Sequence, residues 1–190
     1  MAMGLRLLGR GARGKIMIAS LHIGGAAFGG FLTGAVVGLT GAVFSLHPLR
    51  PFVIAITAVL LLIAHARRPR VKFGLRRQVP QHWVATMPQP RRYLLWGGLL
   101  GSGVTTVIPY SAFVLLLSVQ LTSGVLLGAV SGAIFGLARQ GTAALAASCR
   151  VPIERLGASL ATLHNPALRL NTVALVGGAV ALVYATSLAA

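Results

Sequence analysis

The chain has 190 residues, of which 56% are hydrophobic and only 9% are charged. That balance leaves too little polar surface to cover the core of a water-soluble domain of this size. It has 17 lysines and arginines but a single acidic residue, which gives a net charge of +16. Because these basic residues flank apolar segments and do not interleave with aromatic residues, the charge indicates membrane topology and argues against nucleic-acid binding.

Five apolar segments in chain order predict an all-α, polytopic integral membrane bundle that forms one transmembrane domain over residues 1–190. A helix needs about 20 apolar residues to cross a bilayer. The first segment is longer than that, so it is either one tilted helix or a helix whose first turns lie in the interface near His22. A soluble all-α core is the competing interpretation, and the scarcity of carboxylates argues against it. The expected spans are 20–46, 51–66, 94–120, 123–146 and 171–189.

The basic residues are unevenly distributed between the two sides of these spans. Fifteen precede the first span or lie in the second and fourth connections, whereas only Arg50 lies on the opposite side. Cytoplasmic loops of membrane proteins are enriched in lysine and arginine. The chain is therefore expected in the plasma or inner membrane, with its N-terminus in the cytoplasm and its C-terminus outside. A signal peptide is the alternative for the N-terminus, but the apolar run continues well past Gly24-Gly25-Ala26-Ala27, so cleavage is not expected.

The two cytoplasmic connections differ in character. Residues 67–92 contain four prolines among eight basic residues, which predicts a loop without a long helix, lying against the anionic inner leaflet. Residues 152–163 place apolar side chains on one helical face, which predicts a short helix in the interface.

Two stripes of glycine at every fourth position predict close helix packing. The stripe in the first span is Gly30, Gly34 and Gly38, and the stripe in the fourth is Gly124, Gly128, Gly132 and Gly136. Small residues at this spacing let helix backbones approach closely in lipid. The partner can be a helix of the same subunit or of another one.

Polar residues inside the spans are the candidate site. The third span contains Thr105, Thr106, Pro109, Tyr110 and Ser111. One interpretation is a proline kink whose hydroxyls bond back to the backbone, and the other is a broken helix that lines a substrate path. Arg139 either extends its side chain to the cytoplasmic face or binds an anion at the inner mouth of that path.

Two glycine-rich openings, Phe28-Gly29-Gly30-Phe31-Leu32 and Trp96-Gly97-Gly98-Leu99-Leu100, resemble each other. With the proline-containing span they resemble the cytochrome c biogenesis transmembrane family (the CcdA and DsbD type) and the related small exporters. The resemblance implies two repeats of three helices with inverted topology. That family's thiol relay needs a cysteine pair, and this chain has only Cys149, so the resemblance implies a relative without redox activity.

The scarcity of acidic residues limits the functions that the chain can have. Glu154 is the only acidic residue, so we expect no enzyme activity, no cofactor or metal, and no transport coupled through intramembrane carboxylates. One hypothesis is a permease or channel for a small neutral or anionic solute. The other is a non-catalytic structural or assembly subunit whose glycine stripes contact other membrane subunits or further copies of itself. The path of the permease would be lined by Thr33, Thr40, Thr105, Thr106, Tyr110 and Ser111.

Overall fold

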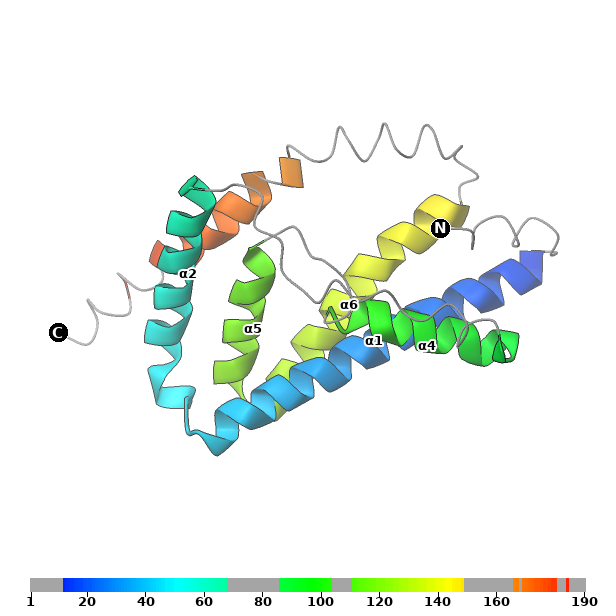
Figure 1. Cartoon of the computed structure of the whole chain (residues 1–190), viewed down its shortest axis with the longest axis horizontal. Helices are drawn as coiled ribbons and strands as arrows, with labels where there is room; N and C mark the ends of the chain where they lie inside the picture. Colours follow the sequence, from blue (N-terminus) through cyan, green and yellow to red (C-terminus); the bar gives the residue numbers. More distant parts are fainter. Residues whose placement is uncertain are drawn as a thin grey trace.

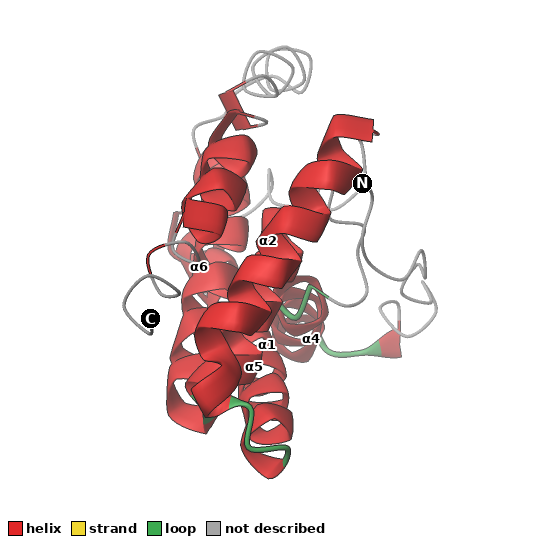
Figure 2. Cartoon of the chain, turned by 90° about the vertical axis from the view of Figure 1, so that its left-hand side faces the viewer, coloured by secondary structure: helices red, strands yellow, loops and turns green. Residues whose placement is uncertain are grey.

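The structure of the protein is a computed structural model. The structure describes residues 12–67, 86–103, 111–148, 166–167, 169–180 and 184. Within these ranges every regular element is a helix and no strand occurs (Figure 2). The predicted all-α class is therefore confirmed for the part of the chain that the structure describes.

The first two helices are joined by a short turn and diverge from it (Figure 1). Helix α1 covers Ala12–Val43, a single 3-10 turn, η2, covers His47–Leu49, and α2 covers Arg50–Arg67. Their apolar stretches, Ile16–Val43 with 28 residues and His47–Arg67 with 21, are long enough to cross a membrane. Helix α1 is continuous over the first of these stretches, and both alternatives for it, a tilted helix or first turns in the interface near His22, stay predictions.

The expected third span consists of two helices with a break between them. Helix α4 covers Gln89–Gly101 and α5 covers Ala112–Ser123. Each is about 18–20 Å long at the usual rise per residue, well short of a hydrocarbon core of about 30 Å. In Figure 1, α4 runs alongside α1 whereas α5 runs alongside α2, so the two helices do not share an axis. The expected span 94–120 is therefore not one continuous helix, and that these residues cross a membrane stays a prediction.

The break begins earlier than the proline. Helix α4 ends at Gly101, and Gly103 has a φ of 73°, in the left-handed region that glycine adopts at low cost. Such a glycine just after the last helical turn is a common helix stop. Pro109, on which the sequence-based kink depended, lies outside the described residues.

The remaining helices complete the bundle. Helix α6 covers Val125–Ser148, close to the expected 123–146, and residues 169–180 are helical within the expected 171–189. The expected interfacial helix at 152–163 and most of the basic loop at 67–92 lie outside the described residues.

The two short turns lie at the same end of the bundle (Figure 1). One joins α1 to α2, and the other, at Gly124, joins α5 to α6. The backbone of Leu121 lies directly against Gly41, which brings the second turn next to the first. Helix α6 therefore runs antiparallel to α1. The sequence also predicts that these two turns share one side of the membrane, the side with few basic residues.

The distribution of side chains is the reverse of that in a water-soluble protein. Among the described residues, four of the seven buried hydrophobic ones are alanines, namely Ala26, Ala55, Ala58 and Ala129. Large apolar side chains instead point outward, including Phe28, Phe31, Leu32, Val36, Leu39, Ile56, Leu60, Leu126, Leu127 and Ile134. In water such a continuous apolar exterior is strongly unfavourable.

Candidate functional site

The two predicted glycine stripes face each other within this chain. Gly30 lies against Gly132, Gly34 against Gly128, and Gly38 against Gly124. A Cβ atom built on Gly128 would lie 2.5 Å from the carbonyl oxygen of Gly34, and one on Gly30 would overlap the carbonyl oxygen of Gly132. The stripes therefore serve contact between α1 and α6 of the same subunit, which resolves the alternative that the sequence left open.

Helix α1 also presents glycines to α4. Gly25 and Gly29 lie against the backbone of Leu94 and Gly98, and Gly101 lies against Ala26. The two similar glycine-rich openings are therefore in contact. Because later residues of α1 meet later residues of α4, the two helices run parallel. The resemblance to the cytochrome c biogenesis family stays a prediction.

A buried polar cluster lies where α5 begins. The side-chain oxygen of Asn171 accepts hydrogen bonds from the backbone N–H of Ala112, at 2.7 Å, and from the Ser111 hydroxyl, at 3.2 Å. The amide nitrogen of Asn171 lies 3.0 Å from the Ser111 oxygen, which can accept from it when the hydroxyl proton points elsewhere. Asn171 thus supplies an acceptor to the Ala112 N–H in the first turn of α5, where N–H groups have no partner four residues back in the helix. Ser111 and Asn171 are only 3% and 4% exposed.

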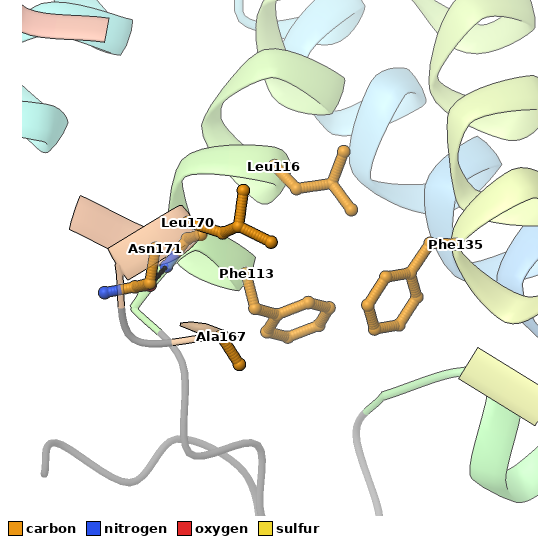
Figure 3. A pocket seen from close by; sticks show the side chains of 7 residues that line it. Phe113, Leu116, Phe135, Ala167, Leu170 and Asn171 are labelled. Atoms are coloured by element: carbon orange, nitrogen blue, oxygen red, sulfur yellow. Dashed lines mark hydrogen bonds between the residues drawn. The ribbon is translucent and has the colours of Figure 1, made fainter. Parts of the chain in front are cut away.

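An open apolar pocket adjoins this cluster. It has a volume of about 340 Å³ and lies between α5, α6 and residues 166–171 (Figure 3). In Figure 3, Phe113 of α5 and Phe135 of α6 lie side by side, with Leu170 above them. Asn171 is the polar residue among those that line it: Ala112, Phe113, Leu116, Phe135, Ala167, Leu170 and Asn171.

Aromatic contacts connect this pocket with Arg139. The ring centroids of Phe113 and Phe135 are 5.0 Å apart, and the rings are inclined by 34°. The guanidinium carbon of Arg139 lies 5.9 Å from the centroid of Phe135. This distance is within the range of a cation–π interaction, so the charge of Arg139 lies over an aromatic wall of the pocket.

Polar side chains continue along α5 inside the bundle. Ser118, Gln120 and Thr122 are all buried. Thr122 donates to the carbonyl oxygen of Ser118 at 2.9 Å, and Ser118 to that of Leu115 at 2.8 Å. The buried side-chain oxygen of Gln120 has no hydrogen-bond partner among the described residues. Such a group destabilises the fold unless water or a ligand satisfies it.

Two further predicted path residues, Thr33 and Thr40, lie on α1 and bond to its backbone. Thr33 donates to the carbonyl oxygen of Gly29 at 3.0 Å, and Thr40 to that of Val36 at 2.9 Å. Thr40 is exposed on the outer surface of α1, and neither hydroxyl is brought to Ser111. Thr105, Thr106, Pro109 and Tyr110 lie outside the described residues, so of the candidate stretch in the third span only Ser111 is placed.

The sequence analysis did not single out Asn171 or Gln120. Each is an amide side chain within an otherwise apolar segment, and a polar residue in a predicted span is a functional signal by itself.

Compared with models of protein families, with curated proteins and with solved structures, the chain shows no significant match.

Proposed function

We propose that the chain is a five-span integral membrane protein with a cytoplasmic N-terminus, and that it acts as a permease or channel for a small neutral or anionic solute. The membrane location is supported by two helices long enough to cross a bilayer and by the apolar exterior around an alanine- and glycine-rich interior. Lipid gives no hydrophobic drive for large apolar side chains to turn inward, so such a distribution is stable there.

The orientation is supported by the positions of the turns. The α1–α2 and α5–α6 turns share one end of the bundle, and the sequence puts only Arg50 near that end. In the sequence, the other basic residues outside the spans precede the first span or follow the second and fourth ones. This is the asymmetry that the positive-inside rule associates with an outer and a cytoplasmic face.

The solute path is proposed along α5. The observation that supports it is a discontinuous span, α4 and α5, whose second half presents buried polar groups to the interior: Ser111, Ser118, Gln120 and Thr122. Broken helices in transporters commonly line substrate sites. The unpartnered oxygen of Gln120 gives a passing solute or water a hydrogen-bond acceptor. Because the described residues include no acidic side chain, passive movement is proposed.

The alternative, a non-catalytic subunit of a larger complex, loses part of its support. It relied on glycine stripes as docking surfaces for partner helices. The structure pairs those stripes with each other across α1 and α6, so the described glycines of the two stripes are already in contact. A partner would then have to use another surface.

Flux into reconstituted vesicles tests the permease proposal. Glycerol serves as the neutral probe and chloride as the anionic one, in vesicles of phosphatidylethanolamine and phosphatidylglycerol. We expect flux of at least one probe above protein-free vesicles, lowered several-fold by Gln120→Leu. Ser131→Ala is the control, because it also removes a polar group, one that bonds to Gly128 of its own helix α6 outside the proposed path.

Two results would contradict the proposal. Flux of both probes equal to that of empty vesicles would end it, and so would equal flux in Gln120→Leu and the unchanged protein. Recovery of the chain in a stable complex with other membrane proteins, together with no flux, would favour the subunit alternative.

A further inference from the structure

The pocket between α5, α6 and Ala167, Leu170 and Asn171 is lined almost entirely by apolar side chains. Its one polar lining residue, Asn171, already holds hydrogen bonds with Ser111 and Ala112. A polar solute would therefore lose water there without gaining a free partner from that wall, which is unfavourable. The volume of about 340 Å³ is at the lower end of the range for ligand pockets, about 300–1,000 Å³. These properties suit an apolar chain.

A cation lies beside this apolar pocket. Arg139 stands over the ring of Phe135, which is one of its walls. Arg139 follows the start of α6 at Val125 by fourteen positions, or about 21 Å along the helix axis. In the proposed orientation this is the cytoplasmic half of the bilayer, from which an arginine can extend toward the headgroups. A guanidinium has five donors in a planar fork that matches the oxygens of a phosphate.

We propose that this pocket holds an acyl chain of an anionic phospholipid whose phosphate is bound by Arg139. The inference relies on the proposed membrane location but not on solute transport. The chain would lie against Phe113, Phe135 and Leu170, while the phosphate meets the guanidinium above Phe135. The net charge of +16 favours an anionic over a zwitterionic lipid, because the protein attracts negative headgroups to its surface.

Lipid retention by the full-length protein tests this. The protein is equilibrated in mild detergent with equimolar phosphatidylglycerol and phosphatidylcholine, and bound lipid is measured by native mass spectrometry. We expect several-fold preferential retention of phosphatidylglycerol. Arg139→Gln should reduce that preference toward equality, and Leu116→Trp, which fills the pocket, should reduce retention of both lipids. Leu126→Trp is the control, because Leu126 is 74% exposed on α6 and does not line the pocket.

The outcomes separate this inference from the proposed function. An unchanged preference in Arg139→Gln, or unchanged retention in Leu116→Trp, would overturn the lipid site. If Leu116→Trp does not fold, Ala112→Leu fills the same pocket with a smaller side chain. A protein that needs detergent yet retains neither lipid contradicts this inference alone, whereas a protein soluble without detergent contradicts the membrane location itself.

Discussion

The ring nitrogen Nε2 of His22 and the side-chain oxygen of Gln140 lie 3.1 Å apart, at the end of the contact between α1 and α6. From this pair the helices meet at every fourth residue, first at Ala26 and Gly136 and then along the facing glycines. The glycines let the two backbones come close, but they have no side chain that could hydrogen-bond across the contact. We therefore infer that the His22–Gln140 hydrogen bond helps to fix the register of the two helices.

A double-mutant cycle measures this bond. His22→Ala and Gln140→Ala should each lower the free energy of unfolding in detergent, and the double variant should lose less than the sum. We expect a coupling of about 0.6 kcal/mol, typical of hydrogen bonds between membrane helices. As a control, Gln140→Ala and Ser131→Ala should be additive, because Ser131 bonds to Gly128 of its own helix. Additivity of His22→Ala and Gln140→Ala would mean that the bond does not contribute.

The glycine contact predicts opposite effects of the same substitution at two places on α1. Gly34→Ala puts a methyl group into the backbone of Gly128, so the helices must separate. We expect a loss of about 1–3 kcal/mol, as for other overpacked cores, measured as a lower thermal midpoint in detergent. Gly24→Ala meets no atom within 4 Å, and alanine is the better helix former. Its midpoint should stay equal or rise, and a similar loss at both positions would contradict the contact.

The helical class and the main packing contact could be predicted from sequence because both leave a periodic signal. Long apolar runs predicted helices, and glycine at every fourth position predicted close approach. Which stripe meets which could not be predicted from periodicity, since any small-residue stripe can pair with any other. The early end of α4 could have been predicted from Gly101, Ser102 and Gly103, but proline is the stronger helix breaker, so the sequence-based kink was expected at Pro109.

The candidate site was harder to predict than the fold. Ser111 and Asn171 are 60 positions apart in the sequence and meet only after α5 and the last helical segment pack together. Nothing in the local pattern around Asn171 specifies that partner. Thr33 and Thr40 bond to the backbone of their own helix, as hydroxyls in apolar helices often do, and their place along a path stays a prediction.

The Asn171 contact predicts a stability loss specific to the start of α5. Asn171→Leu removes the acceptor for the Ala112 N–H and the partner of Ser111, leaving polar groups unpaired in the interior. We expect a loss of about 1–3 kcal/mol, seen as a lower midpoint of unfolding in detergent. Ser131→Ala, which removes one bond within its own helix, should cost clearly less. Equal midpoints for the two variants would contradict the capping role.

The proposed orientation predicts which sites a membrane-impermeant thiol reagent can reach. In a Cys149→Ser background, a cysteine at His47 should be labelled in intact cells, because η2 lies at the proposed outer end. A cysteine at Arg76 should be labelled only after the membrane is opened, because the basic loop is proposed to be cytoplasmic. The reverse pattern would overturn the orientation while leaving the helical bundle intact.

The apolar exterior predicts a depth-dependent cost for arginine on the outer face of α1. Phe28 and Phe44 are both outward-facing, 60% and 69% exposed, so neither substitution disturbs the interior. Phe28→Arg puts a charge near the middle of the apolar stretch Ile16–Val43, where insertion is opposed by about 2.5–3.5 kcal/mol. Phe44→Arg lies at the end of that stretch, where the side chain can reach the headgroups. We therefore expect Phe28→Arg to lower the carbonate-resistant membrane fraction strongly and Phe44→Arg to leave it nearly unchanged. In a water-soluble protein both substitutions would be tolerated, because an exposed arginine is well hydrated, so equal tolerance would contradict lipid as the surroundings of this helix.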